Sequence, residues 1–233
     1  LPRYTHPEVG YSLEDLPESD EIFSLFGEIK QMRNNHDIRL SFHPDQFNVL
    51  ASPHDAVIAN TYRELAYQGM IAELVDADVI NLHVGGAYGD KNGALNRLKN
   101  NVMGLPQTVR KRLSFENDDV SYTPKELLPV CEELNIPMVY DIHHHRCLAD
   151  GLSEKEVTDR VVKLWKRLGK EPYFHISSPK NGWLNGSPKP HADYIDPHDF
   201  PDFWKGLSAT IDVEAKAKEL AVMKLQLETL ELQ

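Results

Sequence analysis

The sequence has few cysteines and no long apolar run. Its 233 residues include two cysteines, Cys131 and Cys147, which are too few for a framework of disulfide bonds. No apolar stretch approaches the roughly 20 residues that a membrane-spanning helix needs, and no signal peptide is recognisable. We therefore expect a protein of a reducing compartment, the cytoplasm, with no membrane partner.

Positive charge is also in short supply. The chain has 25 Lys and Arg residues against 36 Asp and Glu residues, which gives a formal net charge of −11 at pH 7. This balance argues against a protein that binds nucleic acid through a simple basic surface. Bound metal ions would neutralise some of these carboxylates locally, so the count does not exclude a nucleic-acid substrate.

The composition is otherwise that of an ordinary globular protein, with 41% hydrophobic and 26% charged residues. A chain of this length can bury a sizeable core without disulfides or other covalent links. No repeat, low-complexity segment or break in composition marks a second domain. We expect one domain over residues 1–233.

Short strand-like runs alternate with amphipathic stretches along the chain. The predicted strands are Ile38–His43, Val79–Val84, Arg112–Asn117, Met138–His144, Tyr173–Ser178 and Thr210–Ala215. The predicted helices include Asp20–Asn34, Asp55–Leu74, Thr123–Asn135, Ser153–Leu168 and Ala215–Leu232. Thr123 before Pro124, and Ser153 three residues before Glu156, are typical helix starts. This alternation predicts an α/β fold with a parallel sheet.

Six strands are fewer than the eight that a closed barrel needs. The chain opens with loop-like residues before its first helix. We expect a TIM-type (β/α) barrel that is incomplete at its N-terminus and lacks the first one or two strands. An open six-stranded sheet is the structural alternative.

Every predicted strand ends in, or next to, a good metal ligand. In chain order these residues are His43, His83, Glu116, Asp141 with His144, His175 and Glu214, and His191 lies in the loop after the fifth strand. In parallel α/β barrels the carboxyl ends of the strands form the active-site face. A barrel would therefore bring these residues to one end.

Imidazole and carboxylate ligands together bind zinc or manganese, and a mixed set of this size indicates more than one ion. Closely spaced ions can activate a water, hold a phosphate and stabilise a leaving oxyanion, as phosphodiester hydrolysis requires. A single histidine at a strand end is usually structural. The inference therefore depends on the recurrence of ligand residues at the ends of all six strands. Periodicity alone cannot choose among His143, His144 and His145.

Two loops could contact a ligand. Gly85–Gly89, which includes Tyr88, follows the His83 strand, and glycine there would let backbone approach a phosphate, although a plain turn explains it nearly as well. Gln46 and Phe47 follow His43 and place an amide beside an aromatic ring. Such a pair could stack on or wedge between bases, whereas a loop with one semi-buried Phe is at least as good an explanation.

These segments resemble the UV damage endonuclease family. The matching motifs are SFHPDQF, NLHVGGAYGDK, LSFENDD, VYDIHHH, FHISSPK, the His191 of KPHAD, and DVEAKAKE, in that order from about Ser41 to Glu219. The family is in turn similar to endonuclease IV and to xylose-isomerase-like barrels.

The resemblance implies a TIM barrel that incises DNA 5′ to cyclobutane dimers, 6-4 photoproducts and abasic sites. It also implies two or three divalent ions, most often manganese, with zinc or magnesium as alternatives. By motif position the metal ligands are His43, His83, Glu116, Asp141, His144, His175, His191 and Glu214, which selects His144 from the histidine run. Glu116, Glu214 and Asp141 would be catalytic, and Gln46, Phe47 and Tyr88 would contact damaged DNA.

Two departures from the family pattern stand out. The family's first two strands, which carry another histidine ligand and further lesion-contacting residues, have no counterpart before Leu1. Many members also have Lys two residues before the histidine that matches His175, and here that residue is Tyr173. We expect metal bridging or tuning to differ at this position.

We expect a monomer that acts on damaged double-stranded DNA in the cytoplasm, in a bacterial nucleoid-associated pool. The nearest rival is a sugar isomerase or epimerase, because those enzymes use the same barrel with fewer ligands. An inactive truncated barrel is the rival from another class.

Overall fold

The computed structural model describes residues 12–231, and the side chains of residues 12–229. The chain divides into two compact units, Leu1–Ser114 and Phe115–Gln233. The division falls inside the third strand, so each unit contains part of that strand. We describe the two units in turn.

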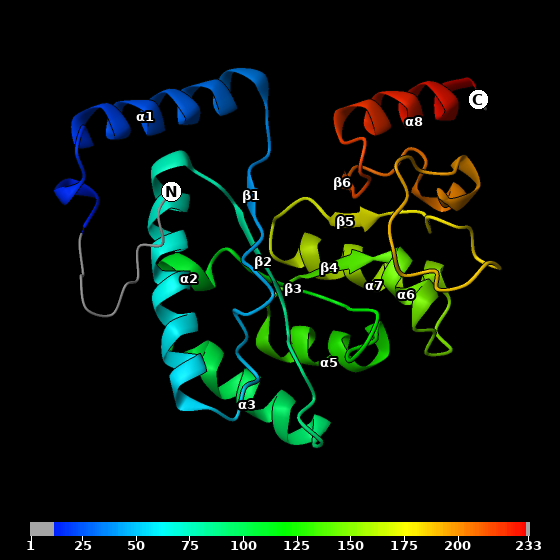
Figure 1. Ribbon diagram of the computed structural model, residues 1–233, viewed down its shortest axis with the longest axis horizontal. Helices are drawn as coiled ribbons and strands as arrows, with labels where there is room; N and C mark the ends of the chain where they lie inside the picture. Colours follow the sequence, from blue (N-terminus) through cyan, green and yellow to red (C-terminus); the bar gives the residue numbers. More distant parts are fainter. Residues whose placement is uncertain (1–11, 232–233) are drawn as a thin grey trace. The chain divides into compact units, whose positions relative to one another are not determined.

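The first unit is mainly helical around two parallel strands (Figure 1). Its elements are η1 (Leu13–Asp15), α1 (Ser19–His36), β1 (Ser41–Phe42), α2 (Asp55–Val75), β2 (Val79–His83), α3 (Lys91–Met103), α4 (Gln107–Arg110) and the start of β3 (Leu113–Glu116). Ser41 pairs with Val79 and Phe42 with Ile80. Helix α2 contacts both α1 and α4.

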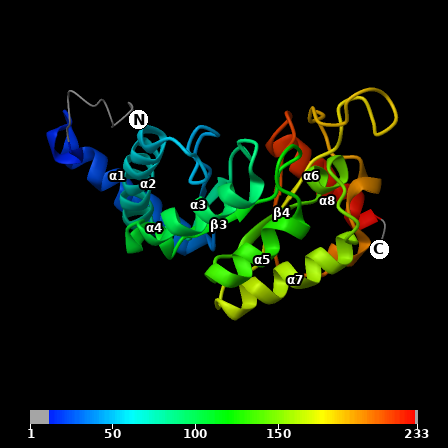
Figure 2. The same ribbon diagram turned by 90° about the horizontal axis from the view of Figure 1, so that it is seen from below.

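The second unit contains the larger part of the sheet. After β3 it comprises α5 (Pro124–Leu134), β4 (Met138–Asp141), α6 (Ile142–Cys147), α7 (Glu154–Arg167), β5 (Tyr173–Ile176), η2 (Pro197–Asp199), η3 (Asp202–Trp204), β6 (Thr210–Val213) and α8 (Glu219–Glu231). Strands β3 to β6 pair in parallel, each with the next. Helices α5 and α7 lie side by side against β4 (Figure 2). The Trp165 indole of α7 donates to the Met138 carbonyl at 2.7 Å, which fastens helix to strand.

The described residues contain six strands, and their order in the sheet follows the chain from β1 to β6. Successive strands are joined by helical segments, and strand residues such as Ile80, Phe115, Val139 and Phe174 are completely buried. Burial of this kind is typical of a parallel sheet, whose two faces are both covered. The α/β prediction is confirmed. Among the described residues, no helix is long and apolar enough to cross a bilayer.

Several predicted elements are shorter in the structure. The strand expected over Met138–His144 ends at Asp141, because the Asp141 carboxylate accepts the His144 backbone N–H at 2.7 Å and so caps α6. The strand expected to reach Ala215 ends at Val213, and the last helix begins at Glu219 instead of Ala215. The helix starts at Thr123 and Ser153 are confirmed.

Gly85 lies where the loop after β2 presses against the segment after β1. Its φ is +99°, a conformation that L side chains rarely adopt, and a Cβ there would lie 2.6 Å from Val49 Cγ1. The close approach that this glycine permits is therefore made to Val49, within the fold.

We expect Gly85→Ala to lower the free energy of unfolding more than Gly89→Ala does. Both glycines have positive φ, but a Cβ on Gly89 would meet nothing within 4 Å, so the comparison isolates the clash with Val49. The difference should be about 1–3 kcal/mol, the usual cost of overpacking. Urea titration of the two variants measures it, and equal losses would contradict the role given to Val49.

Candidate metal centre

Four ionisable side chains meet at the carboxyl ends of the strands in the second unit. Glu116 and Asp141 are the last residues of β3 and β4, His175 lies in β5, and Glu214 directly follows β6. One ligand atom from each of these four residues lies within 4.8 Å of those of the other three. Parallel strand ends thus bring together residues that are distant in sequence. We call Glu116, Asp141, His175 and Glu214 the ligand cluster.

Three members of the ligand cluster are closed to solvent, whereas the Glu214 side chain is 29% exposed. Glu116 and Asp141 have no exposed surface, and His175 is only 3% exposed. His175 Nδ1 lies 3.2 Å from Glu116 Oε1 and 3.0 Å from Glu214 Oε1, so one imidazole nitrogen faces two carboxylates. Buried carboxylates at this spacing require compensating positive charge.

In this arrangement the histidines supply that charge as protons. Burial disfavours the imidazolium of His175, but the carboxylates of Glu116 and Glu214 outweigh burial and raise its pKa well above the usual value. The same balance, with Asp141 and Glu116 as the carboxylates, raises the pKa of His144 to about 10. A divalent cation would also compensate the negative charge of these carboxylates.

The pKa of Asp141 is raised by its burial and by carboxylates that lie close to it. Burial, together with the charges of Glu116 and Glu214, raises its pKa to about 6 against the opposing effect of His144. The pKa of Glu214 moves in the opposite direction. Burial raises it, but the hydrogen bond to His175 and the charges of His175 and His144 together lower it by more. Two acidic groups of one cluster are thus driven apart in pKa.

Asn117 holds the end of β4 in place, and sequence reasoning did not single it out. Its amide donates to the Asp141 carbonyl at 2.8 Å, and its side-chain oxygen accepts from the Asp141 N–H at 3.0 Å. Its own carbonyl lies 3.0 Å from His144 Nδ1. The available signal was its place directly after Glu116, where an amide can reach the neighbouring strand.

His144 and His191 lie at the edge of the ligand cluster. His144 Nδ1 lies 3.3 Å from Asp141 Oδ2 and 3.5 Å from Glu116 Oε1. His191 Nδ1 lies 3.6 Å from Glu214 Oε2, and burial lowers its pKa. The second unit therefore gathers six of the eight expected ligands around one point.

The other two histidines of the run have different surroundings. His143 is completely buried against the rings of Trp183 and His191, and burial lowers its pKa to about 4. His145 lies between the Tyr140 hydroxyl at 2.8 Å and Asp150 at 3.0 Å. Because α6 starts directly after Asp141, the three rings point in different directions.

Hydrogen bonds hold the loop that carries His191 in place. Asp199 accepts hydrogen bonds from the Ser178 hydroxyl at 2.5 Å and from the Trp183 indole at 2.7 Å. The Ala192 N–H donates to the Ser178 carbonyl at 2.8 Å, directly beside His191. This long loop is therefore a positioned part of the site.

Tyr173 takes part in the support behind His175. Its hydroxyl donates to Asp212 Oδ2, and the same oxygen lies 3.8 Å from His175 Nε2. Asp212 thus lies on the side of His175 opposite Glu116. Sequence reasoning missed Asp212, although its position two residues before Glu214 on β6 was a usable signal.

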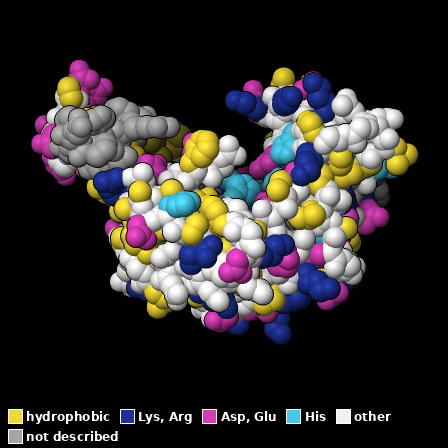
Figure 3. Space-filling model, turned by 60° about the horizontal axis from the view of Figure 1, so that its bottom comes forward, with side chains coloured by type: hydrophobic (Ala, Val, Ile, Leu, Met, Phe, Trp, Pro, Cys, Tyr) yellow, Lys and Arg dark blue, Asp and Glu magenta, His cyan; other side chains and the backbone are white. Residues whose placement is uncertain are grey.

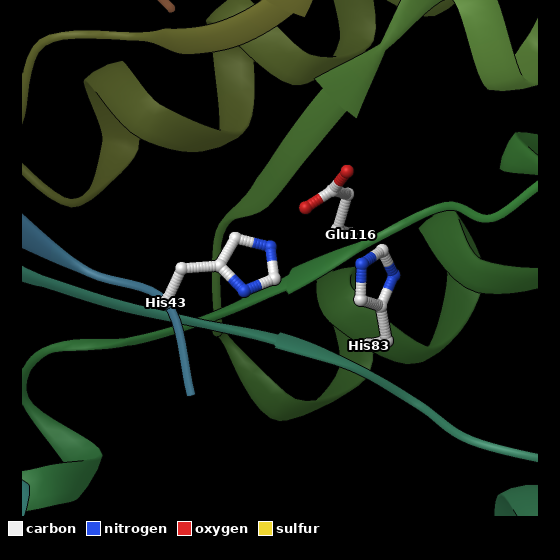
Figure 4. Close-up of side chains that lie close together, drawn as sticks. All are labelled: His43, His83 and Glu116. Atoms are coloured by element: carbon white, nitrogen blue, oxygen red, sulfur yellow. The ribbon is translucent and has the colours of Figure 1, made fainter. Parts of the chain in front are cut away.

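The first unit holds the two remaining expected ligands. The rings of His43 and His83 have centroids 5.1 Å apart, and Figure 4 shows these two side chains and the Glu116 carboxylate on β3. His43 is exposed and His83 half-buried. Two imidazoles from neighbouring strands therefore offer a second pair of nitrogen donors.

The expected DNA-contacting residues also belong to the first unit. Phe47 is 73% exposed, and its N–H donates to Asp45 Oδ1 at 2.7 Å, which closes a tight turn around Gln46. The alternative expectation of a semi-buried Phe47 is therefore wrong. Tyr88 is 44% exposed, with the Arg97 guanidinium 5.9 Å from its ring centre.

The ligand cluster fits a divalent metal. It offers carboxylate and imidazole donors, the ligand types that zinc and manganese accept. The raised pKa values of His144 and His175 indicate that the buried carboxylates favour a cation at this point. Asn117 provides His144 with an outer hydrogen bond of the kind that commonly orients metal ligands. The Asp212 carboxylate lies 3.8 Å from His175 Nε2 and adds an outer charge.

A parallel sheet with ligands at the carboxyl ends of its strands places this chain among the α/β barrel proteins with a candidate metal centre. The fold comparison agrees. The crystal structure of SacUVDE superposes with a TM-score of 0.85 at 29% identity and covers 97% of this chain and 75% of that one. Endonuclease IV from Thermus thermophilus shares the fold, with a TM-score of 0.64 at 17% identity over 97% of this chain and 87% of that one.

The family model of UV-endonuclease UvdE matches residues 1–233. A UV DNA damage endonuclease from Bacillus velezensis is 36% identical over 97% of this chain and 71% of its own length. The chain belongs to the UvdE family. The resemblance inferred from the sequence motifs and the TIM-type fold are both confirmed.

In the metal-free protein, His144 should make stability depend on pH. Its folded-state pKa, about 10, exceeds the unfolded value of about 6.5. The charged imidazole therefore contributes stability fully below about pH 6.5, and that contribution is lost as pH rises towards 10. We expect the difference in free energy of unfolding between wild type and His144→Gln to shrink over this range.

Denaturant titrations at several pH values in the presence of a chelator measure this difference. The control is His36→Gln, which changes an exposed histidine at the end of α1. Its difference from wild type should stay constant above pH 7. A pH-independent difference for His144→Gln would show that the carboxylates do not hold its proton.

Proposed function

We propose that this chain is a metal-dependent DNA repair endonuclease that cleaves the phosphodiester 5′ to UV photoproducts, namely cyclobutane dimers and 6-4 photoproducts, and also at abasic sites. The observation that carries the proposal is the ligand cluster, in which Glu116, Asp141 and His175 are buried and Glu214 is half-buried. Family membership supplies the substrate class, since the curated relatives are named as UV DNA damage endonucleases. The protein would act in the bacterial cytoplasm on nucleoid DNA.

The proposed site uses all eight expected ligands. Glu116, Asp141, His144, His175, His191 and Glu214 would hold one group of ions, and His43 and His83 would complete the ligand set. Two or three ions are proposed, with manganese first and zinc or magnesium as alternatives. Bound ions would supply Lewis-acid stabilisation of phosphate oxygens and lower the pKa of water.

Hydrogen bonds within the protein would orient the metal ligands. Asp141 is fixed by Asn117 and by the first turn of α6, so its carboxylate keeps one direction. Glu116 and Glu214 share the proton of His175, which metal binding would release. Burial of the ligand cluster keeps competing water away and strengthens each electrostatic contact.

Phe47 and Gln46 would read the lesion through stacking. A photoproduct weakens base stacking locally, so an inserted ring meets a lower unstacking cost there than in intact duplex. The exposure of Phe47 on a closed turn supports this role. Tyr88 would contact the DNA from the loop after β2.

Glu116→Gln should abolish metal-dependent nicking, because the amide removes one charge from the centre of the ligand cluster. We expect a loss of at least about 100-fold in rate, the lower bound for removing an essential electrostatic contact. The assay follows nicking of a duplex with one cyclobutane dimer. The matched control is Glu156→Gln, an exposed residue of α7, which should keep full activity. Unchanged nicking in Glu116→Gln would overturn the proposal.

Phe47→Ala should weaken binding to dimer-containing DNA by about 5- to 150-fold, which corresponds to the 1–3 kcal/mol of one stacked base. Phe47→Tyr should retain most of the affinity, since it keeps the aromatic face. Fluorescence anisotropy with damaged and intact duplexes measures the effect. Met103→Ala removes another exposed apolar side chain and is the control. Equal losses on both duplexes would exclude a role in lesion recognition.

Metal content separates the proposal from its rivals. Two or more ions per chain support the endonuclease, and one ion together with sugar turnover and no nicking supports an isomerase or epimerase. No bound ion would support an inactive barrel. Elemental analysis of the purified protein after dialysis against manganese measures the ratio.

A further inference from the structure

A groove of about 760 Å³ opens beside the ligand cluster in the second unit. Its charged lining comes from the loop after β5, from β6 and from the segment after β6, and comprises Lys189, His191, Asp212, Glu214, Lys216 and Lys218. Glu214 and His191 belong to the candidate metal centre, so the groove begins where the ligand cluster ends. It therefore presents carboxylates at the ligand cluster and ammonium groups beyond it.

Two lysines of the groove, Lys216 and Lys218, differ from several other lysines of the second unit. The third groove lysine, Lys189, pairs with Asp119 at 3.4 Å. Lys155, Lys205 and Lys224 each pair with a carboxylate on their own element or turn. Lys216 and Lys218 are exposed, and neither pairs with a carboxylate among the described residues. Unpaired ammonium groups on an acidic protein are available to an anionic ligand.

The wall that carries these lysines is held by backbone bonds. The Lys216 N–H donates to the Ala192 carbonyl at 3.1 Å, and the Ala217 N–H donates to the Asp193 carbonyl at 3.0 Å. Lys218 has a φ of +51°, a left-handed conformation that usually favours glycine. The opposite side is fixed by Lys189, whose ammonium donates to the Asp119 carbonyl at 2.7 Å.

Lys and Arg side chains gather next to a histidine at the upper right of Figure 3. The overall charge of −11 makes such a local concentration unexpected for an acidic chain. Several ammonium groups beside a candidate metal centre suit a polymer of phosphates better than a single small anion. The carboxylates at the other end suit cations.

We propose that this groove binds the phosphodiester backbone of duplex DNA next to the bond that is cleaved, with Lys216 and Lys218 as the principal phosphate contacts. This inference rests on the proposed function and assigns it a backbone-binding surface. The contacts are independent of sequence and of damage, because they are made to phosphates. They fix the position of the strand relative to the ligand cluster.

The test is the salt dependence of binding to a short undamaged duplex. Affinities of wild type and of Lys216→Gln with Lys218→Gln are measured by anisotropy between about 50 and 200 mM KCl at constant magnesium. Each phosphate contact contributes about 0.9 to the slope of log affinity against log salt. The double variant should therefore have a slope smaller in magnitude by about 1.8.

Lys163→Gln with Lys166→Gln is the matched control, since it removes the same charge from exposed positions of α7. Its slope should equal that of wild type. Lys218→Gly is a second variant, because glycine suits the left-handed backbone there, so weaker binding with unimpaired stability reports on the ammonium group alone.

An unchanged slope in the groove variant, or equal slopes in both double variants, would overturn the inference. Nicking of a dimer-containing duplex by wild type is measured in parallel. If wild type nicks while the slopes agree, the groove assignment fails and the proposed function stands. If wild type does not nick, the proposed function fails, and altered slopes would still place phosphates in the groove.

Discussion

Two buried carboxylates, Glu116 and Asp141, and the half-buried carboxylate of Glu214 concentrate negative charge that the fold must compensate. His175 faces two of them through one nitrogen, and its pKa rises in consequence. The compensating charge can be a proton or a metal ion, and the two compete for the same atoms. Most of the surrounding structure acts to hold this charge in place: the parallel pairing of β3 to β6, the cap of α6 and the loop before His191.

Residues around the ligand cluster fix the orientation of its side chains. Asn117 bonds both backbone groups of Asp141, and Asp212 lies behind His175. Such outer contacts orient ligands and tune their basicity. Tyr173 enters this outer layer through its bond to Asp212. The charge pattern continues into the groove beyond Glu214, where lysines replace carboxylates. A negative cluster for cations therefore adjoins a positive surface for phosphates.

Sequence patterns predicted much of this organisation. All six strand positions were found, because short β-branched runs separated by helix-length segments have few other solutions. Strand ends were predicted less well. The predicted strand continued to His144, and the choice among His143, His144 and His145 stayed open. In the structure Asp141 caps a helix there and turns the three rings apart. Hydrophobic periodicity carries no information about such a cap, since it depends on one side-chain hydrogen bond. Asn117 and Asp212 were missed for a related reason, because their roles depend on the neighbouring strand.

By itself, the sequence determined the parallel α/β class, the succession of His, Asp and Glu at strand ends, and the family to which the chain belongs. Local propensity and hydrophobic alternation, which act between residues close in the chain, decide the fold class. The ligand succession and the family motifs are properties of the residue order itself. Only the tertiary structure decided which ligand atoms meet within 4.8 Å, which histidine of the run faces Asp141, and that Gly85 makes room for Val49. These features depend on contacts between segments far apart in the chain. Such contacts form only after the strands have paired.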